Sequence, residues 1–225
     1  MIHHIFDLLA YVVGTTLLLT LFKNRTQIIM DANLRYAYYT TVVVGAFFGA
    51  FIFGSLNIYI SMESTMIGKS VLGAIFGGIV AVEGFKKIMS IEGSTGAYFV
   101  PSLAVGIFIG RIGCFLSGLD DYTYGVETDF IFGYDFGDGL LRHPVQLYES
   151  ATMALFFLYV LWTYFKDRIY FENKIFYQFI LLYSTQRFLW EFLKPYETLI
   201  LGLNIFQLLC LVLVVYSIYY MRRVF

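Results

Sequence analysis

The chain has 225 residues, of which 59% are hydrophobic, 20% aromatic and only 14% charged, and its mean hydropathy is +0.73. This composition excludes an ordinary soluble domain and indicates a protein that crosses a membrane several times. The net charge of −1 and the lack of a basic run argue against nucleic acid as a partner.

Seven segments have the roughly 20 mainly apolar residues that a spanning helix needs. The segments are 5–22, 37–60, 67–89, 97–118, 146–165, 174–193 and 199–221. Basic residues follow the first segment rather than precede it, which indicates a retained span and not a cleaved signal peptide. The sequence therefore predicts an all-α membrane protein with seven transmembrane helices, in one domain with a small outer loop region at about 118–145.

The distribution of lysine and arginine predicts the orientation, because these residues are retained on the cytoplasmic side of short loops. Ten of them fall in one set of alternate loops and three in the other. This bias predicts an outside N-terminus, a cytoplasmic C-terminus and an outer position for the 118–145 loop. The ten are Lys23, Arg25, Arg35, Lys86, Lys87, Lys166, Arg168, Lys174, Arg222 and Arg223, and the three are Lys69, Arg142 and Lys194.

Small residues recur every four positions on three spans, a spacing that lets helix backbones approach closely. We interpret most of these rows as helix packing. Gly113 lies beside Arg111, and we expect it instead to leave room for a ligand. The rows are Gly45 with Gly49; Ala46, Ala50 and Gly54; Gly73 with Gly77; Ala74 with Gly78; and Ser102, Gly106 and Gly110.

Arg111 lies inside an apolar run, where an ionisable residue indicates a function because an unpaired guanidinium in hydrocarbon is costly. Tyr183, Arg187 and Glu191 are four residues apart and so share one helix face. These and other polar residues occur at similar depth near the predicted outer ends of the spans, which predicts one polar site. A structural ion pair between Arg187 and a carboxylate is the alternative. The other residues at this depth are Lys69, Ser70, Ser117, Arg142, His143, Gln146, Tyr148, Glu149 and Lys194.

The segment 142–149 gathers polar residues at the start of the fifth span. Pro144 suits the first turn of a helix and favours an extended His143, so a sharp turn into the span is expected. Gln146 and Glu149, three residues apart, then face the same side. Arginines near an outer membrane surface suit a phosphate, since the guanidinium binds oxyanions through paired hydrogen bonds. A phospholipid headgroup is the obvious local phosphate.

Three sequence blocks resemble the signature blocks of the bacterial prolipoprotein diacylglyceryl transferase family, in the same order. They are Gly110-Arg-Ile-Gly-Cys-Phe-Leu-Ser-Gly118, Arg142-His-Pro-Val-Gln-Leu-Tyr-Glu149 and Tyr183-Ser-Thr-Gln-Arg-Phe-Leu-Trp-Glu-Phe-Leu-Lys194. The glycine-rich run at 68–78 looks like a fourth block, and Gln207 stands where the family also has a glutamine. The family's seven spans and its orientation are those predicted above.

The resemblance implies transfer of a diacylglyceryl group from phosphatidylglycerol to a cysteine thiol of a lipoprotein precursor, with release of glycerol phosphate and without a metal or another cofactor. It also implies a bacterial inner membrane protein with its site toward the outer face. The implied catalytic residues are Arg111, Arg187, His143 and Asp121. The implied substrate-binding residues are Ser70, Gly110, Gly113, Cys114, Ser117, Gly125, Arg142, Gln146, Tyr148, Glu149, Tyr183, Glu191, Lys194 and Gln207.

The chain departs from the family pattern at several positions. Leu72 stands where the family's glycine-rich block has a histidine, whose role His143 could take over. Cys114 and Ser117 stand where the family has asparagines. Leu119 stands where the family has a glutamate, and Asp120 or Asp121 could take the place of that glutamate. The two cysteines, Cys114 and Cys210, show no metal-ligand spacing, so neither a disulfide nor a metal is expected.

Three hypotheses follow. The first is the family's ordinary transferase. The second keeps the phospholipid donor and changes the acceptor to another thiol, an amine or a hydroxyl compound. The third is a non-catalytic protein of the same fold that binds or moves phospholipid.

Overall fold

The computed structural model describes residues 2–21, 32–62 and 65–223, which are mainly helical. Lys23 and Arg25, used above for the orientation, lie outside these residues. Seven long helices occur in the described ranges. They are α1 (Ile2–Leu21), α2 (Ala32–Met62), α3 (Val71–Ile88), α4 (Val100–Ser117), α5 (Val145–Lys166), α6 (Arg168–Glu191) and α7 (Ile205–Arg223).

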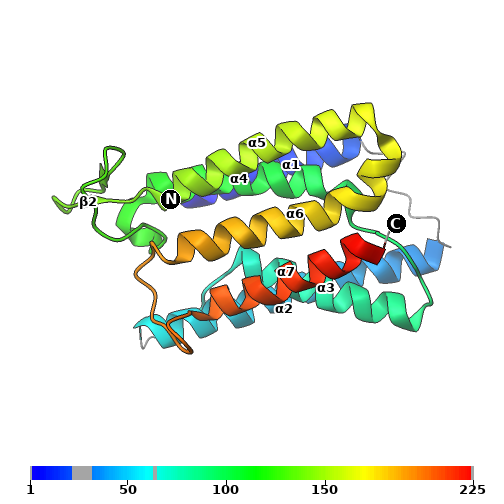
Figure 1. The fold of residues 1–225 in the computed structure, drawn as a ribbon, viewed down its shortest axis with the longest axis horizontal. Helices are drawn as coiled ribbons and strands as arrows, with labels where there is room; N and C mark the ends of the chain where they lie inside the picture. The colour runs from blue at the N-terminus through cyan, green and yellow to red at the C-terminus, as the bar shows by residue number, and fades with distance from the viewer. Residues whose placement is uncertain (1, 22–31, 63–64, 224–225) are drawn as a thin grey trace.

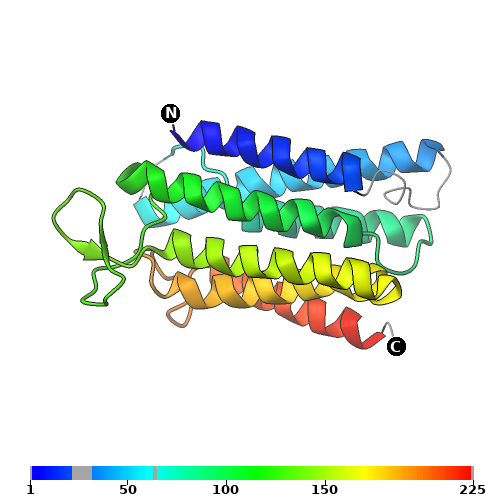
Figure 2. The same cartoon turned by 90° about the horizontal axis from the view of Figure 1, so that it is seen from above.

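The seven helices run alternately up and down along one long axis (Figures 1 and 2). The N-terminus and the 118–145 region lie at one end of the bundle, which we call the N-terminal end. The C-terminus lies at the opposite end, which we call the C-terminal end. The ends of α4 and α6 and the starts of α5 and α7 therefore meet at the N-terminal end.

Five helical segments of the described chain are long and apolar enough to cross a membrane: Ile2–Thr20, Asn33–Ser61, Ala97–Asp121, Val145–Lys166 and Ile205–Arg223. Helix α3 carries Glu83, Lys86 and Lys87 within its 18 residues, and α6 also carries several charges, which lowers the apolar character of both. The protein is thus a multi-pass, largely helical membrane protein.

Each predicted span overlaps one helix, but four predicted starts are wrong by four to six residues. Helices α2 and α6 begin earlier than predicted, at Ala32 rather than 37 and at Arg168 rather than 174. Helix α3 begins at Val71 rather than at 67, because the Ser70 hydroxyl caps it by accepting a hydrogen bond from Gly73 N at 3.1 Å. Helix α7 begins at Ile205 rather than at 199, because residues 199–203 form a turn closed by an Ile200–Leu203 bridge.

Close packing of α2 against α3 confirms the interpretation of their glycine rows. A Cβ added to Gly49 would lie 2.2 Å from Gly73 O, and one added to Gly77 would lie 2.3 Å from Gly45 O. Both distances are too short for any side chain, so the two backbones touch only because glycine is present.

The hydrophobic core lies between α3, α4, α5, α6 and α7. Phe171, Ile175 and Ile180 of α6 are fully buried there, and Leu72 of α3 is 1% exposed. The residue at the family's histidine position is therefore a core side chain that carries no ionisable group.

The 118–145 region contains a little more order than the predicted loop. The turn η2 (Gly118–Asp121) follows α4, and strands β1 (Tyr134–Asp135) and β2 (Leu141–Arg142) pair antiparallel. The all-α prediction thus omits one short hairpin, at the N-terminal end of the bundle (Figure 1).

Candidate functional site

Glu149 is the centre of a buried group of charges at the N-terminal end. It lies in the second turn of α5 and its side chain is 1% exposed. Arg111 Nε lies 2.5 Å from one carboxylate oxygen, while Arg187 Nη1 and Lys194 Nζ lie 2.7 and 2.8 Å from the other. One carboxylate of α5 thus joins the ends of α4 and α6.

Glu191 is the second carboxylate of this group. Arg187 Nε lies 2.7 Å from one of its oxygens, and Lys194 Nζ lies 3.5 Å from the same oxygen. The Asn204 amide donates a hydrogen bond of 3.0 Å to the other oxygen. The planar guanidinium of Arg187 therefore bridges two carboxylates, which a lysine could not do in the same way. We call Arg111, Glu149, Arg187, Glu191 and Lys194 the ion cluster.

The ion cluster holds three cations and two carboxylates, an excess of one positive charge. Every member is buried, with at most 8% of its surface exposed. Because an uncompensated buried charge is strongly unfavourable, the cluster favours a further anion. The ion pair between Arg187 and a carboxylate, the structural alternative considered above, is present. It does not neutralise the cluster, because one positive charge remains without a carboxylate.

Several buried polar side chains near the ion cluster lack hydrogen-bond partners within the described ranges, and two of them lie one turn before a cluster residue on the same helix. The Gln146 amide, one turn before Glu149, is buried with both polar atoms unpaired. The Tyr183 hydroxyl, one turn before Arg187, is also buried and unpaired. Buried polar groups are nearly always satisfied, so these two are candidates to contact a ligand.

Asn204 and Gln207 shape the start of α7. The backbone N–H of each donates 2.9 Å to the side-chain oxygen of the other, which is a reciprocal helix cap. Sequence reasoning found Gln207 but missed Asn204, although Asn-x-x-Gln before an apolar run is a signal for such a cap. The cap fixes the amide that contacts Glu191.

Among the small residues predicted near the site, Gly113 corrects an expectation. A Cβ on Gly113 would lie 2.4 Å from Phe6 Cβ, so this glycine lets α1 pack on α4 rather than leaving room for a ligand. Gly110 has no atom within 4 Å of an added Cβ and so borders open space. The Ser117 hydroxyl donates to Gly113 O at 2.9 Å, and Ser70 caps α3 as described.

The predicted residues of the outer segment make a separate set of contacts. His143 Nδ1 lies 3.3 Å from Tyr148 Oη, and Gly125 N donates to His143 O at 2.9 Å. Arg142 donates two hydrogen bonds of 2.9 and 2.8 Å to Asp138 and so lowers the pKa of that carboxyl. The catalytic role of His143 stays a prediction.

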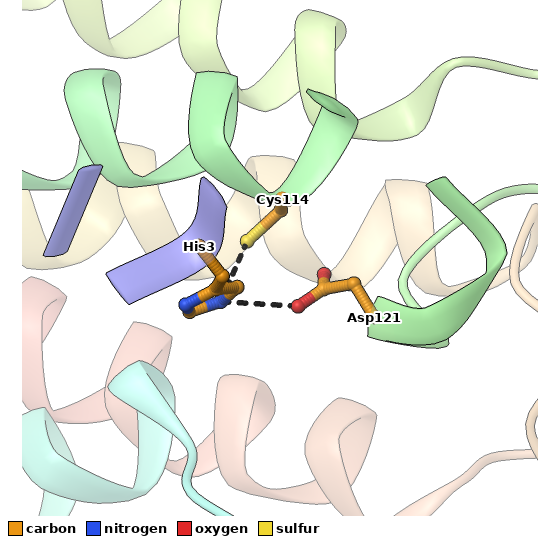
Figure 3. A group of neighbouring side chains, drawn as sticks. All are labelled: His3, Cys114 and Asp121. Atoms are coloured by element: carbon orange, nitrogen blue, oxygen red, sulfur yellow. Dashed lines mark hydrogen bonds and ion pairs between the residues drawn. The ribbon is translucent and has the colours of Figure 1, made fainter. Parts of the chain in front are cut away.

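A second polar group joins Cys114 and Asp121 to a residue that sequence reasoning missed. His3 Nε2 lies 3.0 Å from Asp121 Oδ1 and 3.6 Å from Cys114 Sγ, as Figure 3 shows. Its other ring nitrogen, Nδ1, lies 2.9 Å from Asp7 Oδ2. Arg111 Nη1 lies 3.8 Å from Cys114 Sγ and so connects this group to the ion cluster.

Comparisons with known proteins identify the family of this chain. The model of the prolipoprotein diacylglyceryl transferase family matches residues 3–223. A protein of Ehrlichia ruminantium (strain Welgevonden), named phosphatidylglycerol–prolipoprotein diacylglyceryl transferase, is 31% identical over 69% of this chain and 63% of its own length. A protein of the same name from Nitratidesulfovibrio vulgaris (strain DP4) is 30% identical over 80% of this chain and 72% of its own.

The chain spans less than two thirds of the Ehrlichia relative, at 63% of that relative's length. No solved structure matches the chain. The family match nevertheless covers nearly every residue, including the ion cluster and the Cys114 group. The chain therefore belongs to the prolipoprotein diacylglyceryl transferase family.

Proposed function

We propose that the protein is a transferase that moves a diacylglyceryl group from phosphatidylglycerol to a cysteine thiol of a lipoprotein precursor and releases glycerol phosphate. The relatives' printed names describe this donor and acceptor for those proteins. The observation that carries the proposal for this chain is the excess positive charge of the buried ion cluster.

The charge of the donor fits that excess. A phosphodiester carries one negative charge, which would neutralise the ion cluster when the headgroup binds beside Arg111 and Arg187. The unpaired Gln146 amide and Tyr183 hydroxyl supply further donors for phosphate or glycerol oxygens. Binding would thus satisfy the charge and the hydrogen-bond donors together.

The same residues suit the chemical step. When the bond between the glycerol carbon and the phosphate oxygen breaks, negative charge grows on the leaving phosphate. Arg111 and Arg187 are held by carboxylates in fixed positions, so little reorganisation is needed when this charge develops. We infer that these two arginines stabilise the leaving group, and that Lys194 and Glu191 position them.

We also infer seven membrane spans in one domain, with an outside N-terminus, a cytoplasmic C-terminus and the site facing the outer side of a bacterial inner membrane. The alternating helices and the opposite placement of the two chain ends support this topology (Figure 1). Lys86, Lys87, Arg222 and Arg223, at the ends of α3 and α7, add basic charge at the C-terminal end.

A different acceptor is the second candidate, and Leu72 is the observation that favours it. Its side chain is buried in the core and offers no base at the family's histidine position. The same observation would suit a protein that binds phospholipid without turnover.

Turnover is tested with purified protein in phosphatidylglycerol vesicles, a lipoprotein-precursor peptide and an assay for released glycerol phosphate. We expect Arg111→Ala and Arg187→Ala each to lower turnover by about 10²- to 10³-fold, the usual loss for a donor that stabilises transition-state charge. Arg168→Ala, in an ion pair with Glu172 at the opposite end of α6, is the matched control and should retain turnover.

Saturable phosphatidylglycerol binding without release, with any acceptor, would refute the enzyme and support the binding protein. Release with a small thiol or amine but not with the peptide would support a different acceptor. Full turnover in both arginine variants would refute the site.

A further inference from the structure

We propose that the pocket between the α2–α3 pair and helices α4, α6 and α7 takes one acyl chain of the phospholipid donor and limits the chain length that the protein accepts. The inference rests on the proposed function, because it names the donor lipids that the protein selects. The ion cluster would hold the headgroup at the N-terminal end, and the pocket would hold a chain of the same molecule nearer the C-terminal end.

The pocket is large and mainly apolar. Its cavity volume is about 200 Å³, and most of the surface around it belongs to apolar side chains. One water needs only about 10–15 Å³ of such space, and it also needs polar partners to stay in a buried site. The lining therefore favours an apolar ligand, and the most abundant apolar ligand in a membrane is a lipid chain.

Helix α3 forms the long wall of the pocket with residues three or four apart, from Val71 to Lys86. The helix rises by about 22 Å between these two residues. Val71 is 45% exposed, whereas Lys86 is 5% exposed. Tyr38 of α2, whose ring lies 6.0 Å from that of Phe85, is 1% exposed. The pocket is thus open toward the N-terminal end and covered toward the C-terminal end.

The polar groups at the covered end pair with one another. Lys86 Nζ donates to Glu83 at 3.1 Å, and the Tyr38 hydroxyl donates to Thr95 Oγ1 at 3.0 Å. A charged headgroup would gain little there, since one cation already faces one anion. The excess positive charge lies at the other end, in the ion cluster. A ligand that matches both ends has an anionic group near the ion cluster and an apolar tail in the pocket, as a phosphatidylglycerol molecule has.

The face of α4 that lines the pocket continues toward the ion cluster with glycines. Leu103 lines the pocket, and Gly106 and Gly110 follow at helical spacing on the same face. A Cβ added to either glycine would meet no atom within 4 Å. Arg111 comes directly after the second glycine. Open space therefore leads along α4 from the ion cluster to the pocket.

The distance along α6 fits an acyl chain of ordinary length. From Arg187 of the ion cluster to Phe176, which lines the pocket, the helix rises by about 16 Å. One leaflet supplies half of a hydrocarbon core about 30 Å thick, which is about 15 Å. The Phe176 ring is packed on Gly96, where an added Cβ would lie 2.3 Å from Phe176 Cδ2. A chain longer than usual would meet this ring.

Selection in the pocket is steric, because lipid tails are as apolar as the lining and a chain gains little by leaving the bilayer. Short chains fit, whereas a chain that is too long must bend or displace side chains. Gly78 keeps the middle of the pocket open. A Cβ added there would lie 3.8 Å from Ala46 Cβ, an ordinary contact, so a larger side chain is compatible with the fold and would shorten the pocket.

The limit on chain length is tested with the full chain and an equal mixture of dimyristoyl, dipalmitoyl and diarachidoyl phosphatidylglycerol. Mass spectrometry measures the lipid retained by the purified protein and, separately, the lipid consumed during turnover. We expect the dipalmitoyl lipid to be preferred over the diarachidoyl lipid by about 10-fold, the usual order of the penalty for forcing extra methylenes into a packed site.

Three variants locate the limit. Gly78→Leu should shift the preference to the dimyristoyl lipid, and Phe176→Ala, which adds no volume, should admit the diarachidoyl lipid. Gly84→Leu is the matched control on an exposed position of α3, where an added Cβ meets nothing within 4 Å, and it should keep the wild-type preference.

The two measurements separate this inference from the proposed function. Length-selective retention without release of glycerol phosphate would refute the proposed function and keep the pocket. Turnover with equal use of the three lipids by the wild type, Gly78→Leu and Phe176→Ala would refute the pocket and keep the function. Diacylglycerols with the same chains lack the phosphate and should not be retained. Their retention with the same length preference would refute the assignment to the donor, because the pocket would then take any bilayer chain.

Discussion

The two ends of the helix bundle hold hydrogen-bonded carboxylates in contrasting surroundings, half-buried at the C-terminal end and fully buried at the N-terminal end. At the C-terminal end, Glu83 of α3 accepts hydrogen bonds from Lys86 at 3.1 Å, Tyr216 at 2.8 Å and Tyr220 at 3.2 Å. One cation faces one anion, and two phenols complete the hydrogen bonds. The ion cluster at the N-terminal end has three cations for two carboxylates. A balanced group suits helix packing alone, whereas an unbalanced group favours a further anion.

The largest expected difference is in the cost of removing the central carboxylate. Glu149→Gln leaves three buried cations with one carboxylate fewer, and we expect a loss of about 3–5 kcal/mol in the free energy of unfolding. Glu83→Gln removes a partly exposed pair, and we expect a loss of about 1 kcal/mol or less. Chemical unfolding in detergent measures both.

Adding lipid to the two variants gives a more specific test of this difference. Phosphatidylglycerol should restore part of the stability of Glu149→Gln, because its phosphate supplies the missing anion, and should not restore that of Glu83→Gln. Equal losses in the two variants, or rescue of both by lipid, would contradict the difference between the two ends.

The sequence predicted the residues of the ion cluster well, because a charge in an apolar run is visible without a structure. Arg111, Arg187 and Glu191 were found in this way, and their similar depth in the membrane brought in Lys194 and Glu149. The central position of Glu149 could not be predicted, since it depends on how α5 packs between α4 and α6.

His3 was missed for a related reason. Its partner Cys114 is 111 residues away, and hydrophobic periodicity does not say which helices become neighbours. Gly113 was misjudged on the same grounds, because only the packing of α1 on α4 shows that Phe6 covers it. The start of α7 was predicted too early, since the apolar run at 199–203 hides a turn that the Asn204 and Gln207 cap ends.

A pair of tyrosines provides a smaller and more specific comparison. The Tyr183 hydroxyl is buried without a partner among the described residues, so Tyr183→Phe should leave the free energy of unfolding nearly unchanged while turnover falls. The Tyr216 hydroxyl donates to the half-buried Glu83, so Tyr216→Phe should cost about 0.5–1 kcal/mol while turnover per folded molecule is retained. Thermal unfolding measures the stability of both variants, and glycerol phosphate release measures their turnover. If Tyr216→Phe lost turnover and Tyr183→Phe did not, the functional site would lie at the C-terminal end of the bundle rather than at the N-terminal end.

The smallest effect on stability is expected at Arg142. This residue precedes Glu149 of the ion cluster in the chain, but its side chain pairs with Asp138 in the hairpin. Because this pair lowers the pKa of Asp138, the stability it contributes is present at neutral pH and lost as the pH falls through that lowered pKa. Arg142→Ala should therefore lower the melting temperature slightly at neutral pH and not at all in acid, with turnover nearly unchanged. Melting curves over a pH series test this, with Asp138→Asn as the matched control. A loss of turnover comparable to that of Arg111→Ala would instead place Arg142 in contact with the headgroup and extend the site beyond the buried cluster.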